Sequence, residues 1–298
     1  MNQHERMKAS DFPQELLEIF DGYVHGRMSK RDFLDRAGAF TVAGLSGAAL
    51  IKALQPNYAW AEQVKPDDAR IAATRLTYPS PHGNGTIKAL MVKPAGSTGR
   101  LPGVVVVHEN RGLNPYIEDV ARRVALAGYV ALAPDGLSPF GGYLGDDEKG
   151  AELQMKVDPA KLMEDFFAGF EFLSGHEATN GKVAGLGFCY GGGVVNAMAV
   201  AFPKLAAGVA FYGRQPTGDD VAKITAPLQL HYAALDTFIM PGWPAFEAAL
   251  KANHKTYEAY IYPNVNHGFH NDTTPRYDEA AATLAWSRTL AFFKTYLG

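Results

Sequence analysis

The sequence predicts an α/β fold, in which a mostly parallel sheet carries helices on both faces and a helical extension precedes it. Two observations support this prediction. From residue 71 onward, short apolar runs that are typical of strands alternate with longer segments that have helical spacing. The run at 104–107 is continuous and β-branched, which is typical of a strand buried on both faces of a sheet. We therefore expect an extension over residues 1–61 and one α/β domain over residues 62–298.

The overall composition is that of a globular protein. Hydrophobic residues make up 47% of the 298 positions, which is enough apolar surface to exclude extensive disorder. The formal net charge of −3 would not attract a polyanion, so the composition argues against a nucleic-acid partner. The chain has a single cysteine, which excludes an intrachain disulfide and a cysteine-rich metal site.

The extension begins with an amphipathic segment at 12–27 that predicts a helix. The next residues, 29–34, resemble a twin-arginine export motif in which Lys30 replaces the first arginine. An apolar stretch of small residues at 37–50 follows, and it is too short for a stable membrane span. Residues 59–61 (Ala-Trp-Ala) fit a cleavage site, and cleavage there would give a periplasmic protein.

A retained arm is the alternative to an export signal. In that case the extension stays attached, packs on the body or on a partner subunit, and the protein is cytoplasmic. The sequence does not decide between these two alternatives. It also leaves open whether the protein forms a homodimer.

The elements of the main domain follow from their patterns in chain order. Residues 71–78 and 86–92 alternate and predict an antiparallel pair of strands. Asn114 is expected to cap a helix that runs to residue 126, with Pro115 at its first position. The glycine-rich and acidic segment 137–150 is expected to be a loop near the site. Further strands are expected at 104–107, 130–133, 183–187, 206–211, 228–233 and 257–262, and further helices at 161–173, 191–201, 244–253 and 277–296.

The strongest chemical motif is Gly187-Phe188-Cys189-Tyr190-Gly191. It follows a predicted strand and begins a predicted helix, which is typical of a nucleophile elbow with cysteine as the nucleophile. Glycines on both sides allow the sharp turn, and the helix N-terminus favours the thiolate. The backbone N–H of Tyr190 would help to hold an oxyanion.

Two other interpretations of this motif compete with the elbow. A dinucleotide-binding fingerprint would need glycine at position 190, where Tyr190 stands, so it is disfavoured. A buried, inert cysteine in a glycine-rich turn is the second interpretation, because free cysteines are commonly buried.

Two further polar residues follow predicted strands at the same edge of the sheet. Asp236 comes after the strand at 228–233, and His267 comes after the strand at 257–262. Together with Cys189 they appear in the order nucleophile, acid and base, which is the order of a triad in the α/β-hydrolase fold. The coincidence of three such residues favours a catalytic cysteine over an inert one.

The strand at 104–107 also ends in charged residues. Glu109 is expected to reach the thiol and to control its protonation, although an ion pair is the alternative. The backbone N–H of Asn110 would then be the second oxyanion donor.

These residues together resemble the dienelactone hydrolases, or carboxymethylenebutenolidases, over about residues 71–298. The resemblance implies a hydrolase of small esters or lactones with a Cys-His-Asp triad and no cofactor. It implies that Glu109 partners the resting thiol, and that arginines bind a substrate carboxylate. Arg111 and Arg276 are the candidates for that role, although their positions do not match the family's arginines cleanly. The motifs that carry the resemblance are the elbow, Asp236, Asn266-His267-Gly268-Phe269, Glu109 and the C-terminal helix from Arg276 to Phe293.

Two other functions remain as alternatives. His267, His270 and Asp272 are close enough in sequence to suggest a metal site, but no predicted helix presents them with metal-ligand spacing. The other alternative is a non-catalytic or redox-sensing thiol protein on a hydrolase fold.

Overall fold

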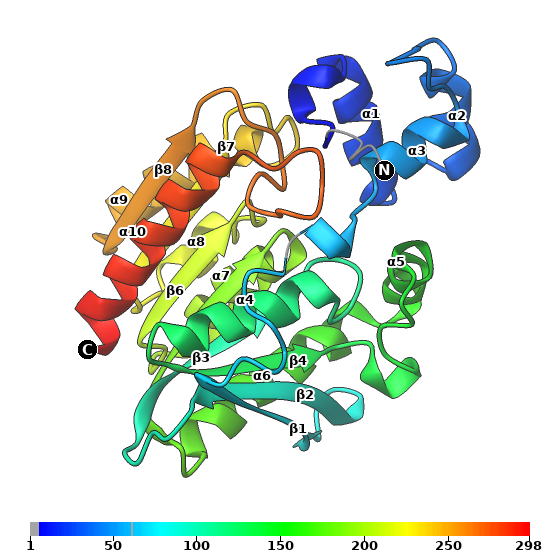
Figure 1. Cartoon of the computed structure of the whole chain (residues 1–298). Helices are drawn as coiled ribbons and strands as arrows, with labels where there is room; N and C mark the ends of the chain where they lie inside the picture. The colour runs from blue at the N-terminus through cyan, green and yellow to red at the C-terminus, as the bar shows by residue number, and fades with distance from the viewer. Residues whose placement is uncertain (1–5, 61) are drawn as a thin grey trace.

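The computed structural model describes residues 6–60 and 62–298, and its centre is a mixed sheet of eight strands (Figure 1). The strand order is β1-β2-β4-β3-β5-β6-β7-β8. β1 and β2 pair antiparallel with each other and β2 pairs antiparallel with β4, while the remaining neighbours are parallel. The mostly parallel sheet is therefore confirmed. The strands are β1 (Ile71–Ser80), β2 (Gly85–Pro94), β3 (Leu101–Val107), β4 (Val130–Asp135), β5 (Thr179–Phe188), β6 (Ala207–Phe211), β7 (Leu228–Ala233) and β8 (Tyr257–Tyr262).

Helices cover both faces of this sheet. The valines of β3 show the two layers, because Val104 and Val106 belong to one buried cluster and Val105 and Val107 to the other. Helices α4 and α10 contribute to the first cluster, and α6, α7 and α9 to the second. Among the described residues, no helix is both long and apolar enough to cross a membrane. The helices of the domain are α4 (Pro115–Leu126), α5 (Asp147–Lys156), α6 (Pro159–Gly175), α7 (Tyr190–Ala201), α8 (Gly218–Val221), α9 (Trp243–Ala252) and α10 (Glu279–Leu297).

Residues 6–60, which we call the N-terminal arm, form three α-helices and two short 3-10 helices, with a small apolar core of their own. The α-helices are α1 (Gln14–Val24), α2 (Lys30–Ala37) and α3 (Ala48–Leu54), and Figure 1 shows them next to α5 at one end of the sheet. Phe20 and Phe33 are fully buried in this core, and their rings pack in a T-shaped, edge-to-face arrangement.

The motif that resembles an export signal is folded within the arm. Ser29 caps α2 and shares a capping box with Asp32, while Lys30 pairs with Glu148 of α5. The apolar stretch at 37–50 is mostly turns and ends in α3. Ala61, the last residue of the proposed cleavage site, lies outside the described residues.

The expected loop at 137–150 is wrong in its last four residues. Asp146 accepts hydrogen bonds from the amides of Glu148 and Lys149 and thereby begins α5 inside that segment. Gly150 lies in this helix because it packs against the chain at Arg111, whose carbonyl oxygen would be 2.5 Å from an added Cβ atom. The glycine that suggested a loop therefore marks a close contact between two elements.

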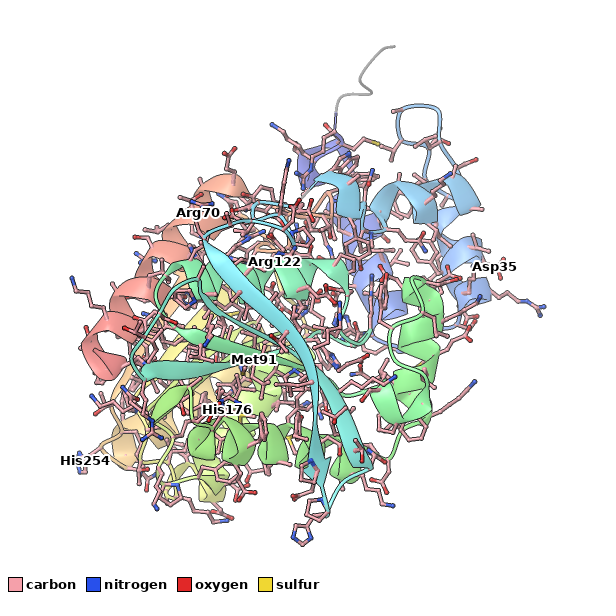
Figure 2. The ribbon with its side chains drawn as sticks, turned by 60° about the horizontal axis from the view of Figure 1, so that its bottom comes forward. Asp35, Arg70, Met91, Arg122, His176 and His254 are labelled. Atoms are coloured by element: carbon pink, nitrogen blue, oxygen red, sulfur yellow. The ribbon has the colours of Figure 1, made fainter. Side chains whose placement is uncertain are left out.

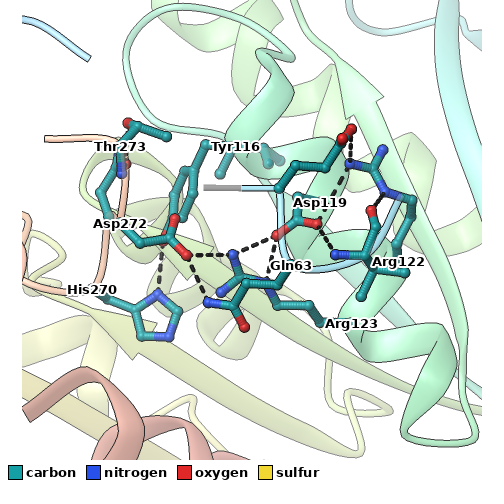
Figure 3. Close-up of polar contacts among 12 residues, drawn as sticks. Gln63, Tyr116, Asp119, Arg122, Arg123, His270, Asp272 and Thr273 are labelled. Carbon is teal, nitrogen blue, oxygen red and sulfur yellow. Dashed lines mark hydrogen bonds and ion pairs between the residues drawn. The ribbon is translucent and has the colours of Figure 1, made fainter. Parts of the chain in front are cut away.

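A buried polar network connects the segment after the arm to α4 and to the loop after β8 (Figure 3). Arg123 of α4 pairs with Asp119 and with Asp272, which lies five residues after His267. Gln63 donates to the same Asp272 carboxylate at 2.7 Å, and Asp119 accepts from the amide of Val64 at 2.8 Å. This network holds the loop that carries His267.

Candidate active site

Cys189 lies at the sharp turn between β5 and α7. Its φ of 54° and ψ of −114° are unusual for a residue with a side chain, as expected of a strained elbow. A Cβ atom on Gly187 would overlap the carbonyl oxygen of Gly191. A Cβ atom on Gly191 would lie 2.8 Å from the carbonyl oxygen of His108, and closer still to that of Val107. The glycines therefore let α7 begin directly against the end of β3.

The other two members of the predicted triad lie next to each other. Nδ1 of His267 is 2.6 Å from Oδ2 of Asp236, and both side chains are buried. Asp236 also accepts from the backbone amides of Phe238 and Ile239, which fix its orientation. Nε2 of His267 is buried and has no hydrogen-bond partner among the described residues. The histidine thus keeps one ring nitrogen free.

A second histidine, which the sequence analysis missed, contacts the thiol directly. His25 follows α1 of the arm, and its Nε2 lies 3.2 Å from Sγ of Cys189. Its Nδ1 contacts Asp21, at 2.7 Å from the backbone oxygen and 3.2 Å from the carboxylate. The rings of His25 and His267 are nearly perpendicular, with centroids 4.7 Å apart. The i,i+4 pair of Asp21 and His25 was the available signal, but such pairs are common on helices.

The two histidines make the thiol acidic. Burial alone raises the pKa of Cys189, but the positive charges of His25 and then His267 lower that pKa to about 5. Burial lowers the pKa of His25, but the Cys189 thiolate and Asp21 together raise it to about 9. Burial also lowers the pKa of His267, but the negative charges of Asp236 and then of the Cys189 thiolate raise it well above its usual value. The site therefore favours a thiolate between two imidazolium ions.

Glu109 lies near the thiol, but its hydrogen bond goes elsewhere. The carboxylate accepts from Nδ2 of Asn271 at 2.9 Å, whereas the hydrogen-bond contact of the thiol is with His25. Burial and then the Cys189 thiolate raise the pKa of Glu109, so the two groups interact electrostatically. Contrary to expectation, Glu109 does not pair directly with the thiol. His25 of the arm occupies that position.

The two expected oxyanion donors lie at the adjoining ends of β3 and α7. Tyr190 is the first residue of α7, where a backbone N–H has no partner within the helix. Asn110 follows β3, and its side chain donates to the carbonyl oxygen of Val24 in the arm at 2.6 Å. The arm therefore also fixes the segment that carries the second donor.

Both arginine candidates are already paired. Nη1 of Arg111 is 3.0 Å from Asp147 of α5, and Nη1 of Arg276 is 3.3 Å from Asp21 of the arm. Arg276 also lies over the ring of Phe20, with its guanidinium carbon 5.5 Å from the centroid. Of the two, Arg111 lines the cavity described below, and Arg276 holds the arm.

A cavity of about 1300 Å³ opens beside the thiol. The arm forms one wall of it through Tyr23, His25 and Arg27, and α6 and α7 form another. Cys189 and His267 both line this space, so the thiol remains accessible with the arm in place. This volume exceeds that of a typical small-molecule site, so the cavity can accommodate a small ester or a lactone ring.

The same residues include donors of the kind that bind transition metals. Sγ of Cys189 and ring nitrogens of His25 and His267 lie within 4.8 Å of one another, and each histidine is backed by a carboxylate, as zinc-bound histidines usually are. The other metal set weighed from the sequence is not brought together: His270 contacts Tyr116, and Asp272 pairs with Arg123.

Two family models match separate parts of the chain. The model of the dienelactone hydrolase family matches residues 87–297. A second model, described as YqhI-like, matches residues 3–43, which include Asp21 and His25. The arm thus has a sequence signature that is separate from that of the hydrolase domain.

Curated relatives and solved structures agree with the first match. A "Putative carboxymethylenebutenolidase" of Escherichia coli O157:H7 is 33% identical and covers 78% of this chain and 90% of its own length. A "Probable 2-oxo-3-(5-oxofuran-2-ylidene)propanoate lactonase" of Bradyrhizobium sp is 34% identical and covers 67% of this chain and 86% of its own. The "Putative hydrolase fragment YghX" of Escherichia coli K12 is 63% identical over 39% of this chain and 98% of its own. The crystal structure of a "Putative Dienelactone Hydrolase" from Klebsiella pneumoniae is 30% identical, with a TM-score of 0.68, and covers 76% of this chain and 99% of its own.

Proposed function

Because the chain belongs to the dienelactone hydrolase family, with the α/β-hydrolase fold of that family, we propose that it hydrolyses small esters or lactones through an acyl-enzyme on Cys189. The observation that supports this proposal best is the buried His267–Asp236 pair beside a thiol whose pKa is about 5. A thiolate is the nucleophilic form of cysteine, so this one is active at neutral pH. Two relatives are named a probable lactonase and a putative carboxymethylenebutenolidase, and these names favour a lactone as the substrate.

The first chemical step forms the acyl-enzyme. The thiolate of Cys189 attacks the ester carbonyl carbon, and the electron pair of the carbonyl moves to its oxygen. The backbone N–H groups of Tyr190 and Asn110 hold this oxyanion. When the tetrahedral intermediate collapses, the C–O bond breaks and an imidazolium gives its proton to the departing alkoxide.

The second step releases the acid. His267, now neutral, takes a proton from a water molecule through Nε2, and the hydroxide attacks the acyl carbon. The C–S bond breaks, and the thiolate and imidazolium are restored. Asp236 holds Nδ1 of His267 throughout and stabilises the positive ring.

The cavity provides room for the substrate next to these groups. Arg111 lines it, so we place a substrate carboxylate near Arg111 rather than near Arg276. Because Asp147 already pairs with Arg111, Arg111 would attract a substrate carboxylate only weakly. Neutral esters and lactones therefore remain good substrates.

A panel of p-nitrophenyl esters and small lactones tests the proposal. Turnover that is lost in Cys189→Ala supports it, as does a burst of acyl-enzyme with the slowest substrates. A redox-sensing thiol is the second candidate, because a low-pKa thiolate is also easily oxidised. A sensor would react with peroxide and turn over no ester, so the same panel separates the two functions.

A further inference from the structure

The arm brings a second histidine–carboxylate pair to the catalytic thiol. His25 with Asp21 lies on one side of Cys189, and His267 with Asp236 lies on the other. The two rings contact each other at nearly a right angle, and the sulfur is within reach of a ring nitrogen of each. His25 makes a hydrogen-bond contact with the sulfur at 3.2 Å.

The contacts of Nδ1 define which nitrogen of His25 faces the thiol. Nδ1 is 2.7 Å from the backbone oxygen of Asp21, which can only accept a hydrogen bond. Nδ1 therefore carries a hydrogen, and Nε2 is the atom that takes a proton from the thiol. Once protonated, Nε2–H donates to the thiolate, and the Asp21 carboxylate stabilises the positive ring from its other side.

Several contacts hold His25 at this position. Arg27 is 2.6 Å from one carboxylate oxygen of Asp21, and Arg276 is 3.3 Å from the other. Gln14 of α1 donates at 2.8 Å to Asn266, the residue before His267. Both histidines and Cys189 line the same cavity, so the arm forms a wall of the site and does not fill it.

We propose that His25 is a second catalytic histidine, which takes the proton of the Cys189 thiol and holds the resulting thiolate as an ion pair in the resting enzyme. This proposal rests on the proposed acyl-enzyme function. No atom is gained or lost: the proton leaves Sγ, binds Nε2 of His25, and the sulfur keeps the electron pair with which it attacks. His267 is then left to exchange protons with the leaving group and the water.

The separate roles of the two histidines follow from the different surroundings of their Nε2 atoms. Nε2 of His25 is occupied by the sulfur, while Nε2 of His267 has no hydrogen-bond partner among the described residues. A nitrogen without a protein partner is the one available to a leaving group or a water molecule. The arm therefore supplies the thiolate, and the hydrolase domain supplies the proton transfers.

The test measures the ionisation of the thiol in the full chain. Because the chain has one cysteine, its thiolate absorbance in the ultraviolet and its rate of labelling by iodoacetamide report Cys189 alone. The charged groups around the His25 ring are Asp21, Cys189 and His267, with Arg27, Arg276 and Glu109 behind them. Variants are His25→Gln and Asp21→Asn, with His82→Gln and Asp35→Asn as matched controls at exposed positions. Figure 2 shows Asp35 on the outer side of the arm.

We expect the midpoint of thiolate formation to lie near 5 in the wild type and to rise by about two pH units in His25→Gln, since loss of one adjacent opposite charge shifts a pKa by roughly 1–3 units. Labelling at pH 6 should then fall about tenfold. Asp21→Asn should shift the midpoint in the same direction, and both controls should leave it unchanged. If His25→Gln does not fold, as judged by its melting temperature, Asp21→Asn alone decides.

A wild-type midpoint in a folded His25→Gln or Asp21→Asn protein would overturn the inference. Failure of the proposed function would look different. In that case no ester is hydrolysed by the wild type, or turnover survives in Cys189→Ala, whatever the midpoint. Recovery of turnover above about pH 8 in His25→Gln, but not in His267→Gln, would support the separate roles of the two histidines.

Discussion

The reactivity of Cys189 is determined by its neighbours, and burial alone would make this thiol inert. A free cysteine in an apolar site has a raised pKa and little nucleophilic character. Here the two imidazolium rings outweigh that effect and bring the pKa to about 5. The residue is thus mostly thiolate at neutral pH, although its side chain is buried.

Cys189→Ala should abolish ester hydrolysis, because it removes the nucleophile. We expect the free energy of unfolding to change by no more than about 1–2 kcal/mol, the usual size of a single-substitution effect. Steady-state assays and a denaturant titration measure the two quantities. Turnover retained in the variant would refute Cys189 as the nucleophile.

Glu109→Gln should shift the thiolate midpoint in the opposite direction from His25→Gln. The Cys189 thiolate raises the pKa of Glu109, and this coupling is mutual, so the ionised Glu109 raises the pKa of Cys189. Removing that charge should therefore move the acid limbs of iodoacetamide labelling and of kcat/KM to lower pH. Identical pH profiles in the wild type and the variant would show that Glu109 has no part in thiol control.

The three residues of the predicted triad share a local signal in the sequence. Cys189, Asp236 and His267 each follow a strand, and a parallel sheet brings the carboxyl ends of its strands to one edge. His25 has no such signal, because it follows an ordinary amphipathic helix and meets the thiol only through tertiary packing. Glu109 was expected to pair with the thiol, whereas its hydrogen bond to Asn271 depends on a loop conformation that no sequence pattern encodes.

At the scale of elements, the elbow depends on the close approach of α7 to the end of β3. Gly191→Ala should destabilise the protein by a few kcal/mol and reduce turnover strongly, since its Cβ atom would collide with backbone that cannot move easily. Gly193→Ala is the matched control in the same helix. An added Cβ atom there meets its nearest neighbour at 3.5 Å, so the variant should be as stable as the wild type or more so.

Thermal unfolding and ester turnover of these two variants check the expectation. Equal losses in Gly191→Ala and Gly193→Ala would show that the helix tolerates no side chain anywhere near its start. Wild-type behaviour in Gly191→Ala would show that α7 can move away from β3 without harm to the site.

Most element boundaries were predictable because propensity and burial agree along this chain. The strands β7 and β8 have the predicted bounds, and Asn114 caps α4 as expected. The segment 147–150 was different, because Gly150 weakens the local preference for a helix. The contact of Gly150 with the backbone at Arg111 lies 39 positions away in sequence, so local reasoning could not detect it.

At the scale of the whole molecule, the arm and the hydrolase domain share one site. Ser29, Asp32 and Phe33 of the export-like motif have structural roles in the arm. Glu148 of α5 accepts from Tyr23, Lys30 and Gln55. These contacts favour the retained arm over the cleaved signal, and we propose that the active form keeps it. Cleavage after Ala61 would remove His25 and one wall of the cavity.

Phe33→Ala should loosen the arm without unfolding the rest. Phe33 is fully buried against Phe20, and truncating such a residue costs about 3–5 kcal/mol. Hydrogen exchange should become faster in α1 to α3 while β3 to β5 remain protected, and the thiolate midpoint should rise as the contact of His25 is lost.

Phe140→Ala, at an exposed position outside the arm, is the matched control and should change neither quantity. Unchanged exchange in the arm of Phe33→Ala would mean that contacts with the body, rather than the small apolar core, hold the arm in place.

The contact between His25 and Cys189 joins residues that are 164 positions apart. A chain is synthesised from its N-terminus, so the arm leaves the ribosome long before the cysteine exists, and His267 follows later still. Until the sheet is complete and the arm has docked, the sulfur is an ordinary thiol with little tendency to ionise. On the proposed mechanism, the nascent chain therefore carries its nucleophile in an unreactive form until the arm and the sheet have come together.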